Sequence, residues 1–131
     1  LETRWDGDET ISRFTPEPYH TAMPGWVYGG LIASLLDCHG TGTASAAALR
    51  REGKEIGDEP SPRYVTARLE VDYLRPTPLG PELEIRGSVE EMTERKVIVN
   101  ETLSAAGEMC ARGRVVAVRM PERFGEPEPG R

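Results

Sequence analysis

The sequence is poor in cysteine, in aromatic residues and in clustered basic charge, and these shortages narrow the possible functions. Its two cysteines, Cys38 and Cys110, match no metal-binding or redox spacing. We therefore expect two reduced thiols in a cytoplasmic protein. The net charge of −6 and the lack of a basic stripe argue against a nucleic-acid partner. A local cluster of cations could still hold an anionic ligand.

Long hydrophobic runs are also missing. The least polar stretch, residues 29–49, contains Asp37, His39 and several hydroxyl side chains. We therefore expect no membrane-spanning helix and no membrane partner. A chain of 131 residues with 37% hydrophobic and 29% charged residues predicts one globular domain, over residues 1–123. Residues 124–131, rich in Pro, Gly and Glu, are expected to be a disordered tail.

Hydrophobic spacing predicts one long helix, residues 29–51, and about six strands. Pro16, Pro18 and Pro24 predict irregular structure before the helix, and residues 52–63 form an exposed connector. The expected strands are residues 2–5, 9–14, 64–74, 82–92, 96–104 and 109–120. A helix that is apolar on most sides must be enclosed, so we predict an α+β fold in which an antiparallel sheet curls around it.

Alternation along two of these strands assigns their faces. In the fourth predicted strand, residues 82–92, the expected inner positions are Leu83, Ile85 and Val89. In the third, residues 64–74, Thr66, Arg68, Glu70 and Asp72 share one face, and the opposite face carries Val65, Ala67, Leu69, Val71 and Tyr73. Within the helix, Gly40 and Gly42 each cost about 1 kcal/mol relative to alanine. They predict either a close backbone contact or a kink.

Asp37 is the only acid between Glu17 and Glu52, and it lies on the predicted helix. An ionised carboxylate in apolar surroundings is costly unless it is paired, hydrogen-bonded or used in chemistry. It could act as a general base or as a nucleophile, or it could only orient the helix. His39 lies about 200° around the helix from Asp37. We therefore expect a packed, hydrogen-bonded histidine and no Asp–His dyad.

Residues 24–37, Pro-Gly-Trp-Val-Tyr-Gly-Gly-Leu-Ile-Ala-Ser-Leu-Leu-Asp, resemble the signature of hotdog-fold acyl-CoA thioesterases, nearest to their phenylacetate-pathway and thioesterase-superfamily-member branch. In that family His-Gly-Gly opens an apolar helix, and an acid follows seven residues after the second glycine, as Asp37 follows Gly30. Residues 64–76 resemble the next strand of the family, in which a Ser or Thr stands ten residues before a proline, as Thr66 does here. The resemblance implies the hotdog fold, an antiparallel sheet wrapped around one long central helix.

The resemblance also implies hydrolysis of acyl-CoA, or related pantetheine thioesters, by Asp37, Gly29 and Thr66. The Gly29 amide would polarise the carbonyl, because N–H groups at a helix N-terminus are free. Thr66 would hold the attacking water across a subunit interface from Asp37. The expected substrate-binding residues are Gly30, Tyr28, His20, Trp26, Met23, Arg75, Arg95 and Lys96. The three cations in that set are candidates for the coenzyme A phosphates, with Arg50, Arg51 and Lys54 as further options.

One departure from the family keeps a second function open. Tyr28 stands where the family commonly has histidine, and a phenol releases its proton only near pH 10. The alternative is therefore a non-catalytic acyl-CoA or acyl binding module on the same fold. An enoyl-CoA hydratase of this fold needs a histidine about five residues after the aspartate, where this chain has Gly42.

The resemblance further implies that the protein works without a metal or a separate cofactor, since coenzyme A is part of the substrate. Proteins of this kind pair their helices and edge strands into dimers, with active sites at the interface. A six-stranded open sheet also leaves edges that need covering. We therefore expect a homodimer or a dimer of dimers.

Overall fold

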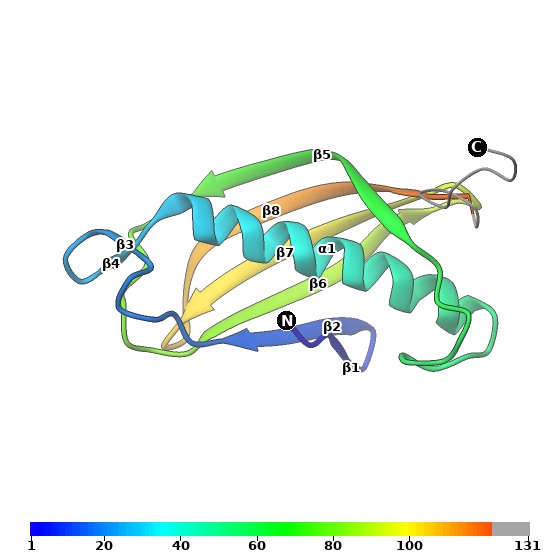
Figure 1. Cartoon of the computed structure of the whole chain (residues 1–131), viewed down its shortest axis with the longest axis horizontal. Coiled ribbons are helices and arrows are strands. Elements are labelled where there is room, and N and C mark those ends of the chain that lie inside the picture. Colours follow the sequence, from blue (N-terminus) through cyan, green and yellow to red (C-terminus); the bar gives the residue numbers. More distant parts are fainter. Residues whose placement is uncertain (122–131) are drawn as a thin grey trace, which may run out of the picture.

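The computed structural model describes residues 1–121, in which a curved antiparallel sheet wraps around one long helix (Figure 1). This is the predicted hotdog fold. Helix α1 spans Gly29–Arg51, as the sequence predicts. The strands are β1 Arg4–Asp6, β2 Glu9–Phe14, β3 Thr21–Met23, β4 Trp26–Val27, β5 Tyr64–Tyr73, β6 Leu83–Met92, β7 Lys96–Ala105 and β8 Glu108–Arg119. The predicted tail, residues 124–131, lies outside the described residues.

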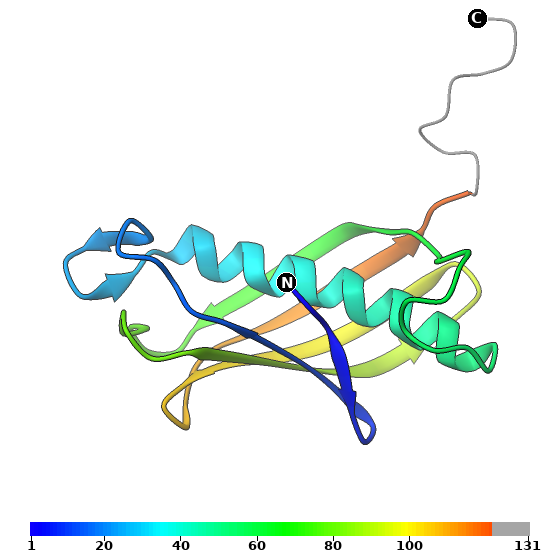
Figure 2. The ribbon, with the colours of Figure 1, turned by 60° about the horizontal axis from the view of Figure 1, so that its bottom comes forward.

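Six strands form the main sheet in the order β1-β2-β6-β7-β8-β5, and all neighbours are antiparallel. Helix α1 lies along one face of this sheet, as the turned view shows (Figure 2). Strands β1 and β5 are the two edges in a single chain. No helix in the described part of the chain combines the length and the apolar character needed to cross a membrane.

A small hairpin, β3–β4, precedes the helix. In this segment before the helix, three prolines predict irregular structure. That prediction is wrong because Pro24 and Gly25 form the turn of the hairpin, with Gly25 at a φ of 86°. Trp26 of β4 also bridges to Pro78 in the loop after β5. The hairpin extends beyond the N-terminal end of α1 (Figure 1), so it carries its exposed residues Met23 and Trp26 to that end.

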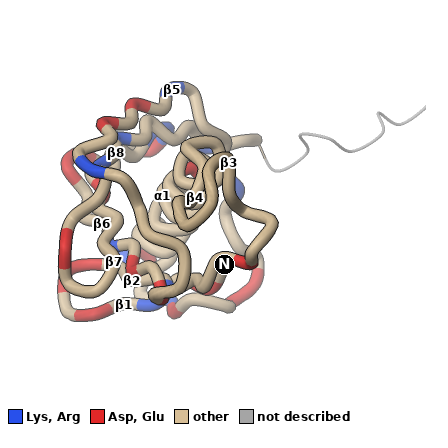
Figure 3. The backbone as a smooth tube through the Cα atoms, turned by 90° about the vertical axis from the view of Figure 1, so that its left-hand side faces the viewer, with Lys and Arg blue, Asp and Glu red and all other residues tan. Residues whose placement is uncertain are grey.

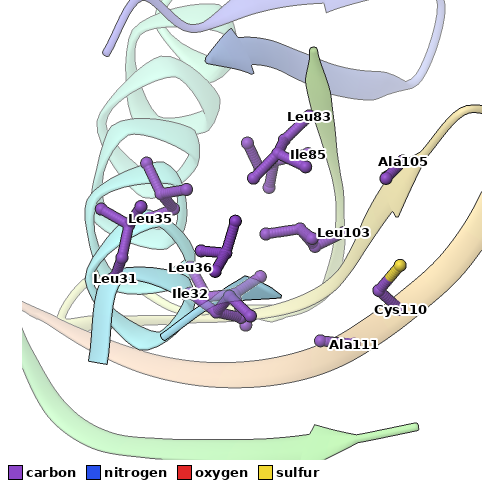
Figure 4. Close-up of a cluster of buried hydrophobic side chains, with 11 residues drawn as sticks. Leu31, Ile32, Leu35, Leu36, Leu83, Ile85, Leu103, Ala105, Cys110 and Ala111 are labelled. Atoms are coloured by element: carbon purple, nitrogen blue, oxygen red, sulfur yellow. The ribbon is translucent and has the colours of Figure 1, made fainter. Parts of the chain in front are cut away.

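The apolar core is divided into two clusters along α1. In the first cluster, four residues of the helix, Leu31, Ile32, Leu35 and Leu36, face Leu83, Ile85 and Leu103 of the sheet (Figure 4). In the second, Ala44 packs against β7 and β8. Between them lies Gly40, where a Cβ atom would come within 2.6 Å of Val115. The close backbone contact predicted from the helix glycines is therefore present.

A group of buried polar side chains lies between the two apolar clusters. The ring of His39 is fully buried, with Nε2 3.0 Å from Thr10 Oγ1 and Nδ1 2.6 Å from Ser12 Oγ. Thr43 Oγ1 lies 2.6 Å from the same Thr10 hydroxyl. Burial lowers the pKa of His39 to about 4, so the ring is neutral at neutral pH. The packed, hydrogen-bonded histidine predicted from the sequence is confirmed.

Strand β5 departs from its predicted alternation at a β-bulge. Thr66 pairs with Ala117 and Arg68 pairs with Val116, which leaves Ala67 as the extra residue. Beyond the bulge Leu69 and Val71 share one face, as predicted, and both pack against the core. Before it Thr66 faces the helix and Val65 is 45% exposed, so the predicted common face does not extend to Val65 and Ala67.

A second irregularity lies near the end of β6, where the register to β7 shifts between Val89 and Glu91. Val89 pairs with the buried Val99 and so keeps its predicted face, but it is 36% exposed. Leu83 and Ile85 are fully buried, as predicted.

Candidate active site

Asp37 and Thr66 form the centre of the candidate site. The bulge in β5 turns Thr66 towards α1, and its hydroxyl donates a hydrogen bond to Asp37 Oδ1. The Asp37 side chain is only partly buried, so its carboxylate is accessible from outside the core. This contact is made within one chain. The expected placement of Thr66 across a subunit interface from Asp37 is therefore wrong.

The N-terminus of α1 presents free main-chain donors. Gly29 and Gly30 lie in its first turn, whose N–H groups have no acceptor inside the helix. Tyr28 occupies the N-cap position with extended backbone angles, φ −75° and ψ 150°, and no side chain among residues 1–121 makes a capping hydrogen bond there. The first turn carries no acid. The positive end of the helix dipole is therefore available to an anion or a developing oxyanion.

Two tyrosine rings enclose this turn. The Tyr73 hydroxyl donates a 2.7 Å hydrogen bond to the Gly29 carbonyl oxygen. A Cβ atom on Gly29 would lie 3.3 Å from the Tyr73 ring, and one on Gly30 would lie 2.8 Å from the Tyr28 ring. The two glycines thus allow both rings to pack directly on the backbone. The sequence does not single out Tyr73 as a site residue. The one indication of such a role is its place at the end of a strand, three residues before Pro76.

Further predicted residues gather at the same end of the helix. The His20 ring lies 6.5 Å from that of Tyr28 and 4.4 Å from that of Tyr19. Its Nδ1 accepts a 2.8 Å hydrogen bond from a backbone N–H. Figure 3 looks onto this end of the molecule, where β3 and β4, which carry Met23 and Trp26, hold no charged residue. The structure therefore brings His20, Met23, Trp26 and Tyr28 to the N-terminus of α1.

The predicted phosphate-binding cations are divided between the two ends of the molecule. Arg75 follows β5 at the Gly29 end and forms a 3.1 Å ion pair with Glu108. Arg95 lies in the β6–β7 turn and Lys96 begins β7, at the C-terminal end of α1 (Figure 1). That end also carries the three further cations, Arg50, Arg51 and Lys54. Of these six cations, Arg75 is the one that lies at the same end of the molecule as Gly29 of its own chain.

Gly29 and Asp37 of one chain are too far apart to act on the same carbonyl. They are eight residues apart on one helix, which corresponds to about 12 Å along its axis. A nucleophile and the carbon it attacks must approach to about 3–3.5 Å. One chain therefore supplies two separate parts of a site, the amide of Gly29 and the carboxylate of Asp37.

Glu101 on β7 is a buried acid that the sequence reasoning missed. It is 3% exposed, and neither of its carboxylate oxygens has a hydrogen-bond partner within residues 1–121. Burial, and to a smaller extent the charge of Asp37, raise its pKa to about 9. The available signal was alternation along β7, since Glu101 shares the inner face with Val97, Val99, Leu103 and Ala105.

Comparison with known proteins decides the family. A family model described as the thioesterase superfamily matches residues 24–111, which include α1, Asp37 and Thr66. The chain belongs to the thioesterase superfamily. The crystal structure of a thioesterase superfamily protein from Shewanella loihica is 56% identical to it, with a TM-score of 0.77 over 92% of this chain and 91% of that one.

Two further known proteins are similar to this chain. The acyl-coenzyme A thioesterase THEM4 of Xenopus laevis is 36% identical over 90 residues. Those residues are 69% of this thioesterase-superfamily chain but 35% of the Xenopus protein, so the chain spans about a third of the length of that curated relative. The BH2602 protein of Bacillus halodurans, solved with CoA, is 22% identical and has a TM-score of 0.69 over 93% of this chain and 75% of its own. That likeness shows the shared fold.

Proposed function

We propose that this protein hydrolyses acyl-CoA thioesters. The observation that carries the proposal is the Asp37 carboxylate, held by Thr66 on a helix whose N-terminal amides are free. Membership of the thioesterase superfamily supports thioester hydrolysis as the reaction. The Xenopus relative, an acyl-coenzyme A thioesterase, supports coenzyme A as the carrier of the acyl group.

The proposed reaction begins with the thioester oxygen bound at the Gly29 N–H, where the helix dipole stabilises negative charge. The Asp37 carboxylate takes a proton from water while the water oxygen attacks the carbonyl carbon. The tetrahedral intermediate then breaks its C–S bond, and the proton held by Asp37 passes to the departing sulfur. The products are a carboxylic acid and coenzyme A. Direct attack by Asp37, through an anhydride that water then cleaves, is the other route open to this residue.

The complete site is proposed to form between two copies of the chain. Because about 12 Å separates the two groups along α1, Gly29 of one subunit must work with Asp37 of the partner subunit. A two-fold axis would create two such sites at once. Strand β5 is an edge strand with exposed Val65 and Tyr73, and the exposed Leu74 follows it. A groove lined by Cys38, Thr41, Tyr64 and Val65 runs beside it along α1, which supports a partner on this face.

Release of free thiol from a panel of acyl-CoA substrates tests the proposal. The panel should include short, long and aromatic acyl groups, each assayed with the purified protein. We expect turnover of at least one of them. Saturable binding of acyl-CoA without thiol release would instead establish the non-catalytic binding module, the alternative that Tyr28 in place of histidine keeps open.

The oligomeric state is a separate prediction. We expect light scattering at micromolar concentration to show a dimer or a dimer of dimers, because neither half-site is complete in one chain. A stable monomer that still hydrolyses acyl-CoA would contradict the shared site.

Thr66→Val should lower kcat for thioester hydrolysis by about 10- to 100-fold, equivalent to about 1.5–3 kcal/mol for a hydrogen bond to a charged group. Valine keeps the shape of the side chain but cannot donate to Asp37. Thr66→Ser keeps the hydroxyl and is the matched control, so its kcat should remain close to that of the wild type. Equal losses in the two variants would show that the hydroxyl has no role.

A further inference from the structure

Glu101 lies in an unusual place for an acid. It sits on the inner face of β7, between Val99 and Leu103. Its partners on the two neighbouring strands are both glycines, Gly87 on β6 and Gly113 on β8. The two positions directly beside it in the sheet therefore offer no side chain to the carboxyl group.

Helix α1 covers the space that these glycines leave. A Cβ atom on Gly113 would lie 3.2 Å from Leu36, the residue before Asp37, and one on Gly87 would lie 3.1 Å from Nε2 of His39. Glu101 therefore lies under the part of α1 that carries Asp37 and the neutral His39, and Asp37 is near enough for its charge to raise the pKa of Glu101. These are the titratable groups that α1 presents towards it.

The cations of the flanking strands point away from Glu101. Arg86 of β6 bonds to Asp6, whereas Arg112 and Arg114 of β8 bond to acids on the outer face, Asp72 and Glu90. The two polar side chains that β2 contributes to the inner face, Thr10 and Ser12, are hydroxyls bonded to His39. An ionised Glu101 would thus have neither a cation nor a hydrogen-bond donor among residues 1–121.

We propose that Glu101 is a positioning residue for Asp37, a role that rests on the proposed hydrolysis. In its uncharged acid form Glu101 adds no second negative charge near Asp37. Loss of the Glu101 proton creates that charge and inhibits the reaction. Ionisation would oppose the negative charge that builds on the carbonyl oxygen during attack.

The protonation state of Glu101 is linked to folding as well. Its pKa is raised from 4.5 to about 9 in the folded chain, first by burial and then by Asp37. The folded state therefore binds this proton more tightly than the unfolded state. The stability that it contributes is complete below pH 4.5 and is lost as the pH rises through about 9.

The pH dependence of kcat in Glu101→Gln tests the role, because glutamine resembles the protonated acid but cannot ionise. We expect kcat of the wild type to fall with a midpoint near the pKa of about 9. In Glu101→Gln this fall should disappear or move upward by at least about one pH unit. Glu94→Gln, which alters an exposed acid in the β6–β7 turn, should keep the wild-type fall. An unchanged alkaline fall in Glu101→Gln overturns the proposal.

A titration that needs no catalysis separates this proposal from the proposed function. The carboxyl carbon of Glu101 can be followed by NMR in the wild-type protein and in Asp37→Asn. Because the charge of Asp37 raises the pKa of Glu101, that pKa should fall in Asp37→Asn. An unchanged pKa overturns the coupling even if the enzyme is active. A fall in a protein that hydrolyses no acyl-CoA supports the coupling while the proposed function fails.

Discussion

Asp37→Asn is expected to lower kcat for acyl-CoA hydrolysis by about 10²- to 10⁴-fold, the usual contribution of a general base. Asparagine has nearly the same shape as aspartate, and its amide oxygen can still accept the hydrogen bond that Thr66 donates to Oδ1. It cannot take a proton from water or act as a nucleophile. The loss should therefore appear in kcat, with the fold and the melting temperature preserved.

Asp72→Asn is the matched control for this experiment. Asp72 is an exposed acid on β5, the strand that carries Thr66, and it pairs with Arg112 at 3.0 Å. We expect its removal to leave hydrolysis close to the wild-type rate, because exposed ion pairs contribute little. If Asp37→Asn hydrolysed acyl-CoA as fast as Asp72→Asn, the role assigned to Asp37 would be wrong.

Gly29→Pro should lower kcat/KM by about 10²- to 10³-fold, the loss typical of removing one oxyanion donor. Gly29 is the first helical residue, a position at which proline is favoured and its missing N–H breaks no helical hydrogen bond. The extended backbone of Tyr28, with φ −75° and ψ 150°, suits a residue that precedes proline. The substitution therefore removes the proposed donor with little cost to the helix.

Gly29→Ala separates the amide from crowding at the same position. Alanine keeps the N–H but places a Cβ atom 3.3 Å from the Tyr73 ring, which must then shift by a few tenths of an ångström. We expect Gly29→Ala to retain most of its activity. Comparable losses in the proline and alanine variants would assign the effect to Tyr73 packing and contradict the role of the amide.

The helix and most strands could be predicted because their signals are local. The prolines before α1 and the polar connector after Arg51 mark its two ends, and the spacing of Gly30 and Asp37 suggests the chemistry proposed here. The β3–β4 hairpin depends instead on a distant segment. The backbone N–H of Val27 in β4 donates to the Thr77 carbonyl oxygen, and that of Leu79 donates to the carbonyl oxygen of Gly25 in the hairpin turn. The local sequence does not reveal these contacts.

Other parts of the site depend on neighbours that alternation cannot show. The bulge at Ala67 arises in the pairing of β5 with β8, and it alone brings Thr66 to the Asp37 side. The burial of Glu101 requires glycines on both adjacent strands, at Gly87 and Gly113. Alternation along β7 places Glu101 on the face of Val99 and Leu103, but it does not show that the residues paired with Glu101 are glycines.

Mixing Asp37→Asn and Gly29→Pro subunits tests directly whether hydrolysis occurs at a site shared by two chains. Each variant alone lacks one essential group at both of its sites, whereas a mixed dimer has one site with both groups intact. Random pairing of equal amounts makes half of the dimers mixed, so about one quarter of the wild-type sites are restored. We expect thiol release to rise to about a quarter of the wild-type rate. Release that stays at the level of the separate variants, in a mixture shown to contain mixed dimers, would contradict the shared site.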